Sequence, residues 1–288
     1  MTLPSIERHR LWINHVNFGK FQKMLLFNDH FIQAHRGASG AFPENTMLAF
    51  KEAAAAGVRS IETDLSLLAD DSFALFHDAN LGRTVDGDCT IGALDANVLC
   101  NYDAGEWRGT DFAGEPIPAM ADALELQRET DIGFNWEIKP HIPSVITNLS
   151  HEYAQLCERH ANALAKALGG VDPSLNMVSS FDRGCLAALV LVMPNISRAL
   201  IAETLPEDWQ NIANELKVEG FHLNYNMLTK EQVEVIHAAG LAVRCYTVNE
   251  LADIERLMDL DVDMVITDWP ERFISLDRPK GFATNKQI

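Results

Sequence analysis

Cysteine is scarce in this sequence, and the few cysteines present do not form a disulfide framework. Only five occur among 288 residues, and no two of them make a Cys-x-x-Cys pair. Disulfide-rich secreted domains have even numbers of closely spaced cysteines, whereas scattered thiols are typical of a reducing compartment. The sequence therefore predicts reduced thiols and a cytoplasmic location.

Long apolar runs are also missing. The longest, residues 185–193, is far shorter than the roughly 20 residues that a membrane-spanning helix needs. Near the N-terminus the best apolar stretch covers only residues 24–27, whereas a signal-peptide core needs about 7–15. We therefore expect no membrane span, no secretory signal and no stable membrane association.

Positive charge is the third shortage. The chain has 23 Lys and Arg residues against 41 Asp and Glu residues, so its formal net charge is -18. A negative field of this size repels nucleic acids and anionic lipid surfaces, and we expect neither as a partner. An anionic small molecule can bind only where the chain supplies local positive charge. The composition leaves the oligomeric state open.

The order of the apolar segments predicts an α/β protein with a (β/α)8 TIM-barrel fold. Short apolar runs alternate with longer amphipathic ones, as in βαβ units with a parallel sheet. Eight strands in about 250 residues is the usual size of such a barrel. Strands are predicted at residues 31–35, 60–64, 132–138, 177–181, 198–202, 220–223, 242–248 and 264–267. Helices are predicted at residues 47–56, 119–130, 151–168, 185–192, 207–216, 230–239 and 250–258.

One segment interrupts this alternation. Residues 65–118 are too many for a strand-to-helix connection, and they contain an alternating run, residues 73–76, after the turn-like Asp70-Asp71-Ser72. We interpret the segment as an insertion after the second strand that begins with a hairpin. The predicted organisation is an extension over residues 1–30, one catalytic barrel over residues 31–276, and a tail over residues 277–288.

The last two repeating units have the clearest helix boundaries. Thr229 is expected to cap a helix that ends at Gly240, and Asn249 to cap the helix after it. Both residue types accept hydrogen bonds from the first backbone amides of a helix. A predicted strand follows each of these helices.

Charged side chains gather where the predicted strands end. In a parallel barrel these ends lie on one face, and that face carries the active site. The residues concerned are His35, Arg36, Glu62, Asp64, His77, Glu137 and Lys139.

The acidic residues indicate a metal site. Glu62 and Asp64 are two apart on a strand, so their side chains point to the same side. Paired carboxylates need a cation, or one of them must take up a proton. With Glu137 the set contains only oxygen ligands, which suit Mg²⁺ or Ca²⁺ better than Zn²⁺. The alternative is that these acids are solvated and paired with Arg36 and Lys139.

The basic residues suit phosphate chemistry. Imidazole titrates near neutral pH, so His35 and His77 are candidates for proton transfer, although most histidines in a protein are only packed or exposed. Arg36 can bind a phosphate through two parallel hydrogen bonds and Lys139 as a point charge. Both can also pair with the neighbouring acids, and the two interpretations are compatible.

Taken in order, these residues resemble a known family. His35-Arg36-Gly37, Pro43-Glu44-Asn45-Thr46, Glu62-x-Asp64, His77-Asp78 and Glu137-x-Lys139 are similar to the signature of the glycerophosphodiester phosphodiesterases, particularly the bacterial cytosolic members associated with glycerol 3-phosphate uptake. Further matches include Ser179-Ser180-Phe181, His222-Leu223-Asn224 and Thr267-Asp268. In the hairpin the family often has Thr and Gly, where this chain has Leu68 and Asp71.

The resemblance implies a fold, a reaction and a set of roles. The fold is a (β/α)8 barrel with an insertion after the second strand. The reaction is hydrolysis of a small glycerophosphodiester to sn-glycerol 3-phosphate and an alcohol, with one divalent cation, Mg²⁺ or Ca²⁺. By motif position, the metal ligands are Glu62, Asp64 and Glu137, the acid/base pair is His35 and His77, and the phosphate contacts are Arg36 and Lys139.

Two other functions fit the same architecture. A related barrel phosphodiesterase could act on lysolipids or other lipid phosphodiesters, but it would need an exposed apolar or basic docking surface. A non-catalytic barrel could bind a phosphorylated metabolite. The acidic composition disfavours the first, and the presence of both histidines with all three acids disfavours the second.

Overall fold

The computed structural model describes residues 30–143 and 150–276. The predicted N-terminal extension, residues 1–30, therefore lies outside the described residues except for His30. The predicted tail, residues 277–288, also lies outside them.

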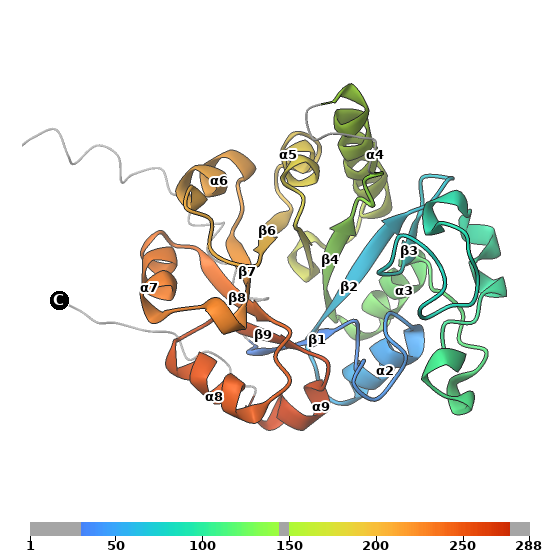
Figure 1. Ribbon diagram of the computed structural model, residues 1–288, viewed down its shortest axis with the longest axis horizontal. Helices are drawn as coiled ribbons and strands as arrows, with labels where there is room; N and C mark the ends of the chain where they lie inside the picture. Colours follow the sequence, from blue (N-terminus) through green and yellow to red (C-terminus); the bar gives the residue numbers. More distant parts are fainter. Residues whose placement is uncertain (1–29, 144–149, 277–288) are drawn as a thin grey trace, which may run out of the picture.

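Eight parallel strands form a closed barrel at the centre of the molecule (Figure 1). Around the barrel their order is β1-β2-β4-β5-β6-β7-β8-β9, and β9 pairs with β1 to close the ring. The (β/α)8 fold is therefore confirmed. The strands are β1 (Ile32–His35), β2 (Ser60–Leu67), β4 (Gly133–Lys139), β5 (Asn176–Ser180), β6 (Ser197–Ala202), β7 (Gly220–Asn224), β8 (Ala242–Tyr246) and β9 (Met264–Thr267).

Helices surround the barrel and cover the outer faces of the strands (Figure 1). Their buried faces and the outer faces of the strands share one apolar core. Within the described residues, no helix is both long enough and apolar enough to cross a bilayer. The α-helices are α2 (Met47–Ala55), α3 (Met120–Thr130), α4 (His151–Ala167), α5 (Arg183–Val192), α6 (Trp209–Leu216), α7 (Lys230–Ala238), α8 (Leu251–Asp259) and α9 (Pro270–Phe273), and short 3₁₀ helices include η5 (Pro173–Leu175), η6 (Tyr225–Met227) and η7 (Ile274–Leu276).

Some of the buried polar side chains of the barrel hydrogen-bond to one another. Trp136 on β4 is fully buried and stacks on Phe134, and its indole N–H donates to Asn176 Oδ1 over 2.7 Å. Inside the barrel, the Gln33 amide donates to the Ser60 hydroxyl over 3.0 Å. Such pairing is favourable because an unsatisfied buried donor costs about 1–3 kcal/mol.

The second strand is three residues longer than predicted. It runs to Leu67 because β3 (Phe73–Leu75) pairs with it antiparallel, with Leu65 opposite Leu75. Glu62 and Asp64 therefore lie within β2 and not at its end. The predicted hairpin is present, and Asp71 at its turn has φ +62°, in the left-handed region that favours glycine.

The rest of the segment between β2 and α3 packs around a small apolar cluster of its own, beside the barrel (Figure 1). It contains short 3₁₀ helices in place of longer elements. These are η1 (Ile91–Ala93), η2 (Ala96–Asn101), η3 (Glu106–Arg108) and η4 (Thr110–Phe112).

Of the two predicted helix caps, one is right and one is wrong. Thr229 caps α7 and forms a capping box with Gln232. Asn249 does not cap α8, whose N-cap is Glu250. The Asn249 side chain instead donates to Asp268 Oδ2 over 2.7 Å and accepts from the Asp268 backbone N–H over 3.0 Å. An asparagine side chain can hydrogen-bond to the first backbone amides of a helix or to other backbone groups nearby. Here it bonds to the residue that follows the neighbouring strand.

We predict that Gly37→Ala destabilises the fold more than Gly170→Ala. Both glycines have φ +84°, so both substitutions strain the backbone by about 1–2 kcal/mol. A Cβ on Gly37 would lie only 2.7 Å from the Ala49 carbonyl carbon, which adds about 1–3 kcal/mol of overpacking. Gly170 has no such neighbour within 4 Å. Urea unfolding of both variants measures the difference, and equal losses of stability would contradict the packing argument.

Candidate active site

The structure brings the predicted site residues together at the mouth of the barrel. The strand register places Asp64 opposite Glu137 and His35 opposite Glu62. His77, which follows β3, lies close enough to Asp64 for their charges to interact. Arg36 and Lys139 complete the group, because both form ion pairs with Asp64.

Three buried carboxylates form the centre of the site. Glu62, Asp64 and Glu137 each place an oxygen within 4.8 Å of the others, and all three side chains are buried. Burial opposes ionisation, and together with the neighbouring negative charges it raises the pKa of Glu62. The same two causes raise the pKa of Glu137 to about 7. Burial acts on Asp64 too, but the charges of Arg36 and Lys139 outweigh it and hold its pKa well below the usual range.

These carboxylates fit a divalent cation. The Lys139 ammonium lies 2.5 Å from Glu137 Oε1 and 3.3 Å from Asp64 Oδ1. Glu62 Oε1 is buried and has no hydrogen-bond partner among the described residues. Two basic side chains thus face three acids, so the positive charges do not balance the negative ones. Carboxylate oxygens are ligands of the kind that Mg²⁺ and Ca²⁺ prefer. The site can hold a metal ion, and no geometric feature selects between these two.

Each candidate histidine is oriented by an aspartate. His35 Nδ1 lies 2.6 Å from Asp268 Oδ1, and His77 Nδ1 lies 2.7 Å from Asp78 Oδ1. In both rings the carboxylate engages Nδ1, which leaves Nε2 as the nitrogen able to exchange a proton with a ligand. His35 Nε2 is 3.8 Å from Glu62 Oε2, so it faces the acidic cluster.

The surroundings of His77 disfavour its protonated form. Burial lowers the pKa of His77, and the positive charges of Arg36 and Lys139 lower it further against the opposing effect of Asp64. His77 is therefore neutral at neutral pH. A neutral imidazole is the form that accepts a proton.

Arg36 is held by acids on two sides. Its guanidinium donates to Glu44 Oε1 over 2.7 Å and lies 3.1 Å from Asp64 Oδ2. Arg83 contacts the same Glu44 carboxylate over 2.7 and 3.0 Å and pairs with Asp78 over 2.5 Å. The ion-pair interpretation of Arg36 and Lys139 is confirmed, and their contact with phosphate stays a prediction.

The sequence analysis assigned no role to several of these supporting residues. Asp268 directly follows β9, so the same rule about strand ends that selected His35 would have found it. Glu44 and Arg83 lie in connections 39 positions apart in the chain, and no sequence signal joins them. Asn45 donates to Asp64 Oδ2 over 2.9 Å from the loop after β1.

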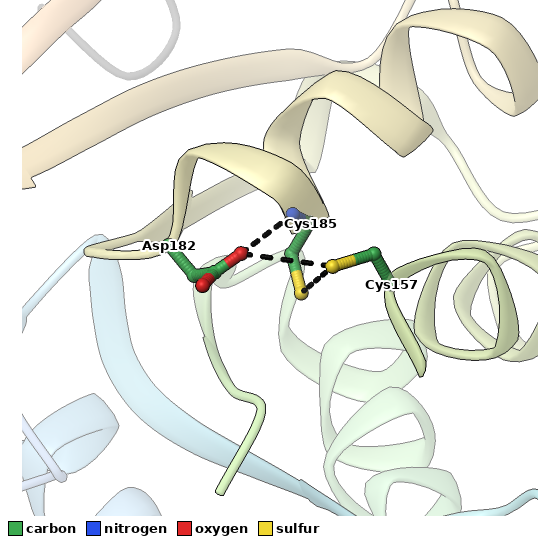
Figure 2. Close-up of side chains that lie close together, drawn as sticks. All are labelled: Cys157, Asp182 and Cys185. Carbon is green, nitrogen blue, oxygen red and sulfur yellow. Dashed lines mark hydrogen bonds between the residues drawn. The ribbon is translucent and has the colours of Figure 1, made fainter. Parts of the chain in front are cut away.

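A second group of potential ligands lies between α4 and α5 (Figure 2). Cys157, Asp182 and Cys185 also place donor atoms within 4.8 Å of one another, with 3.6 Å between the two sulfurs. Here the carboxylate is already engaged, because Asp182 caps α5 through the Cys185 backbone N–H and accepts from the Tyr153 hydroxyl. This cluster therefore fixes the start of α5.

The raised pKa of Glu137 predicts that the metal-free protein loses stability as the pH rises. The ordinary pKa of this carboxyl is 4.5, and folding raises it to about 7. The protonated carboxyl contributes its full stability below the pKa of the unfolded state. This contribution is lost as the pH rises through the pKa of the folded state. In EDTA we expect the free energy of unfolding to fall by up to about 3 kcal/mol between about pH 5 and pH 7.5.

Denaturant unfolding of the wild type and Glu137→Gln at both pH values measures this loss. The variant should lose most of the pH dependence, since its amide does not ionise. Adding Mg²⁺ or Ca²⁺ at the higher pH should stabilise the wild type more than the variant. Equal pH dependence of the two proteins in EDTA would show that ionisation of Glu137 does not cause the loss of stability.

Comparison with known proteins places this site in a family. The model of the "Glycerophosphoryl diester phosphodiesterase family" matches residues 35–272. A glycerophosphodiester phosphodiesterase of Caldanaerobacter subterraneus is 32% identical over 250 residues, which cover 86% of this chain and 98% of that protein. One of Bacillus altitudinis is 29% identical over 253 residues, covering 85% and 97%.

Solved structures agree with this assignment. A phosphodiesterase of Oleispira antarctica, determined in complex with the product sn-glycerol-3-phosphate, is 30% identical with a TM-score of 0.77. The similarity covers 85% of this chain and 95% of that one. The matched range, residues 35–272, spans all seven site residues that the barrel brings together. The chain therefore belongs to the glycerophosphoryl diester phosphodiesterase family, and it is an enzyme of that kind.

Proposed function

We propose that this enzyme hydrolyses glycerophosphodiesters to sn-glycerol 3-phosphate and an alcohol, with a divalent cation and two histidines. The carrying observation is the convergence of Glu62, Asp64 and Glu137 within 4.8 Å at the barrel mouth. Two histidines oriented by aspartates flank these acids. The product bound to the Oleispira phosphodiesterase supports the same chemistry for this chain.

The phosphate is held between positive groups. Arg36 and Lys139 lie beside the acidic cluster and can contact the phosphate oxygens directly. A divalent cation on Glu62, Asp64 and Glu137 would supply further positive charge where negative charge develops on these oxygens. Mg²⁺ and Ca²⁺ both suit this set of ligands.

Proton transfer is divided between the histidines. His77, neutral at neutral pH, removes the proton from the attacking oxygen at its Nε2. His35 donates a proton to the oxygen of the leaving alcohol as the bond from phosphorus to that oxygen breaks. Asp268 and Asp78 hold the two rings in orientation.

The attacking oxygen has two possible sources. The glycerol 2-hydroxyl would give a cyclic phosphate and release the alcohol, and water would then open the ring. Direct attack by water gives the same products in one step. The first route requires the neighbouring hydroxyl and explains why the glycerol group is selected while the alcohol varies.

We also propose that the enzyme works in the cytoplasm on a small soluble substrate and has no nucleic-acid partner. All five cysteines are free thiols, which agrees with a reducing compartment. The net charge of -18 disfavours polyanionic partners.

The proposed function is tested by turnover of glycerophosphocholine with and without EDTA. We expect sn-glycerol 3-phosphate to form, activity to be lost in EDTA, and Mg²⁺ or Ca²⁺ to restore it. Hydrolysis of lysophosphatidylcholine alone would favour the lipid phosphodiesterase alternative. Release of no product from either substrate would contradict the proposal.

We predict that His35→Ala and His77→Ala each lower kcat by at least the roughly 100-fold that loss of an acid or base produces. His237→Ala is the matched control, because His237 pairs with Asp263 over 2.8 Å at the opposite end of the barrel. Steady-state kinetics on the three variants, with circular dichroism to check folding, make the comparison. A folded variant of His35 or His77 with a near-wild-type rate would remove that residue from the mechanism.

A further inference from the structure

One buried hydroxyl lies between the two neighbours of β2. In the sheet β2 lies between β4 and β3 (Figure 1). Ser66 follows Asp64 by two positions on β2 and is completely buried. The strand register places it opposite Lys139 on β4 and opposite Ala74 on β3. Ser66 therefore lies between the strand that ends in Lys139 and the hairpin strand that leads to His77.

The Ser66 hydroxyl forms two short hydrogen bonds. It donates to the backbone carbonyl of Phe76 over 2.7 Å, and His141 Nε2 lies 2.7 Å from the same hydroxyl oxygen. A hydroxyl has one hydrogen and a carbonyl can only accept, so the hydrogen of Ser66 points to Phe76. His141 Nε2 must then carry a proton and donate it to Ser66. The result is a chain from imidazole N–H through hydroxyl to carbonyl, in which each hydrogen bond strengthens the next.

This chain of hydrogen bonds fixes the backbone that leads into His77. The Phe76 carbonyl belongs to the planar peptide unit that contains the His77 N–H. The Phe76 N–H donates to the backbone carbonyl of Asp64 over 3.1 Å, so Phe76 is held on both sides of its Cα. The His77 ring is held separately, because its Nδ1 lies 2.7 Å from Asp78 Oδ1. The bond from Ser66 therefore sets where the backbone of His77 lies, and Asp78 sets how the ring is turned.

His141 is suited to hold this hydroxyl and not to bind a phosphate. It follows β4 and has φ +44°, a left-handed backbone conformation that is uncommon for residues other than glycine. Residues held in such conformations cluster at functional sites. Burial lowers the pKa of His141 to about 4, and the charge of Lys139 contributes to the same shift. The ring is therefore neutral at neutral pH and adds no positive charge for an anion.

We propose that Ser66 and His141 are positioning residues for His77. This inference rests on the proposed function, in which His77 accepts the proton of the attacking oxygen. A misplacement of about 1 Å in a reacting group can cost about 100-fold in rate, so the backbone before His77 must be held closely. The pair also links the hairpin to the segment after β4, and so holds His77 in a fixed relation to Lys139.

Steady-state kinetics on glycerophosphocholine with Mg²⁺ test the pair. Ser66→Ala removes the hydroxyl, and His141→Leu removes the donor. We expect each variant to lower kcat by roughly 10- to 100-fold with KM almost unchanged, because the groups that contact the substrate remain. His141→Gln should recover most of the rate, since its amide N–H can donate to Ser66 in place of the imidazole. Neither Leu nor Gln favours the left-handed backbone, so their comparison isolates the hydrogen-bond donor.

A double-mutant cycle shows whether the effect passes through His77. In the His77→Ala background, Ser66→Ala and His141→Leu should lower kcat no further, because the group that they position is already absent. A loss of the same factor in both backgrounds would overturn the positioning role. A near-wild-type kcat in both single variants, with His77→Ala slow, would overturn it too. A near-wild-type rate for His77→Ala, or no product from the wild type, would instead overturn the proposed function, and the positioning role with it.

Ser197→Ala is the matched control. It removes a hydroxyl that donates to Glu219 over 2.7 Å at the start of β6, at the end of the barrel opposite the mouth. This variant should keep the wild-type kcat. Urea unfolding of every variant checks that it is folded under the assay conditions. His141 is half-buried, so its variants are expected to fold, and the comparison of His141→Leu with His141→Gln decides the test if Ser66→Ala does not fold.

Discussion

The crowding of three carboxylates at one end of a closed barrel is the constraint on which the site depends. Asp64 is completely buried, and the register of β2 with β4 places Glu137 directly beside it. Removing carboxylates from water is unfavourable unless cations or protons accompany them. Arg36 and Lys139 supply two positive charges against three carboxylates, and burial together with the charge of Asp64 raises the pKa of Glu137. One further cation would balance this charge, and the three carboxylates are close enough together to hold it.

Much of this arrangement was predictable because it follows from short-range rules. A period of two along β2 places Glu62 and Asp64 on one side. Alternation of strands and helices predicts a parallel barrel, whose strand ends share one face. The predicted strand bounds agree with the structure within two residues except for the second strand. These rules need no knowledge of which distant residues meet.

The sequence did not predict the contacts of side chains whose hydrogen-bond partners are distant in the chain. Asn249 was expected to cap its own helix, yet it bonds to Asp268 at the end of the neighbouring strand β9. Glu44 joins Arg36 to Arg83, and through Asp78 this chain reaches His77. Such a network depends on the packing of three separate connections at the barrel mouth. Local propensity cannot select one hydrogen-bond partner over another when both are sterically available.

The same balance explains how a protein with a net charge of -18 can accept an anion. In the described structure, the positive charges of Arg36 and Lys139 are paired with Asp64, Glu44 and Glu137. Little positive charge is therefore left to face the mouth of the barrel. On the proposed function, a divalent cation held by those carboxylates would leave the guanidinium and the ammonium free to contact a phosphate at short range, where salt screens them little. On the proposed function, metal binding and substrate binding are therefore coupled, and the affinity for the anion depends on prior neutralisation of the acids.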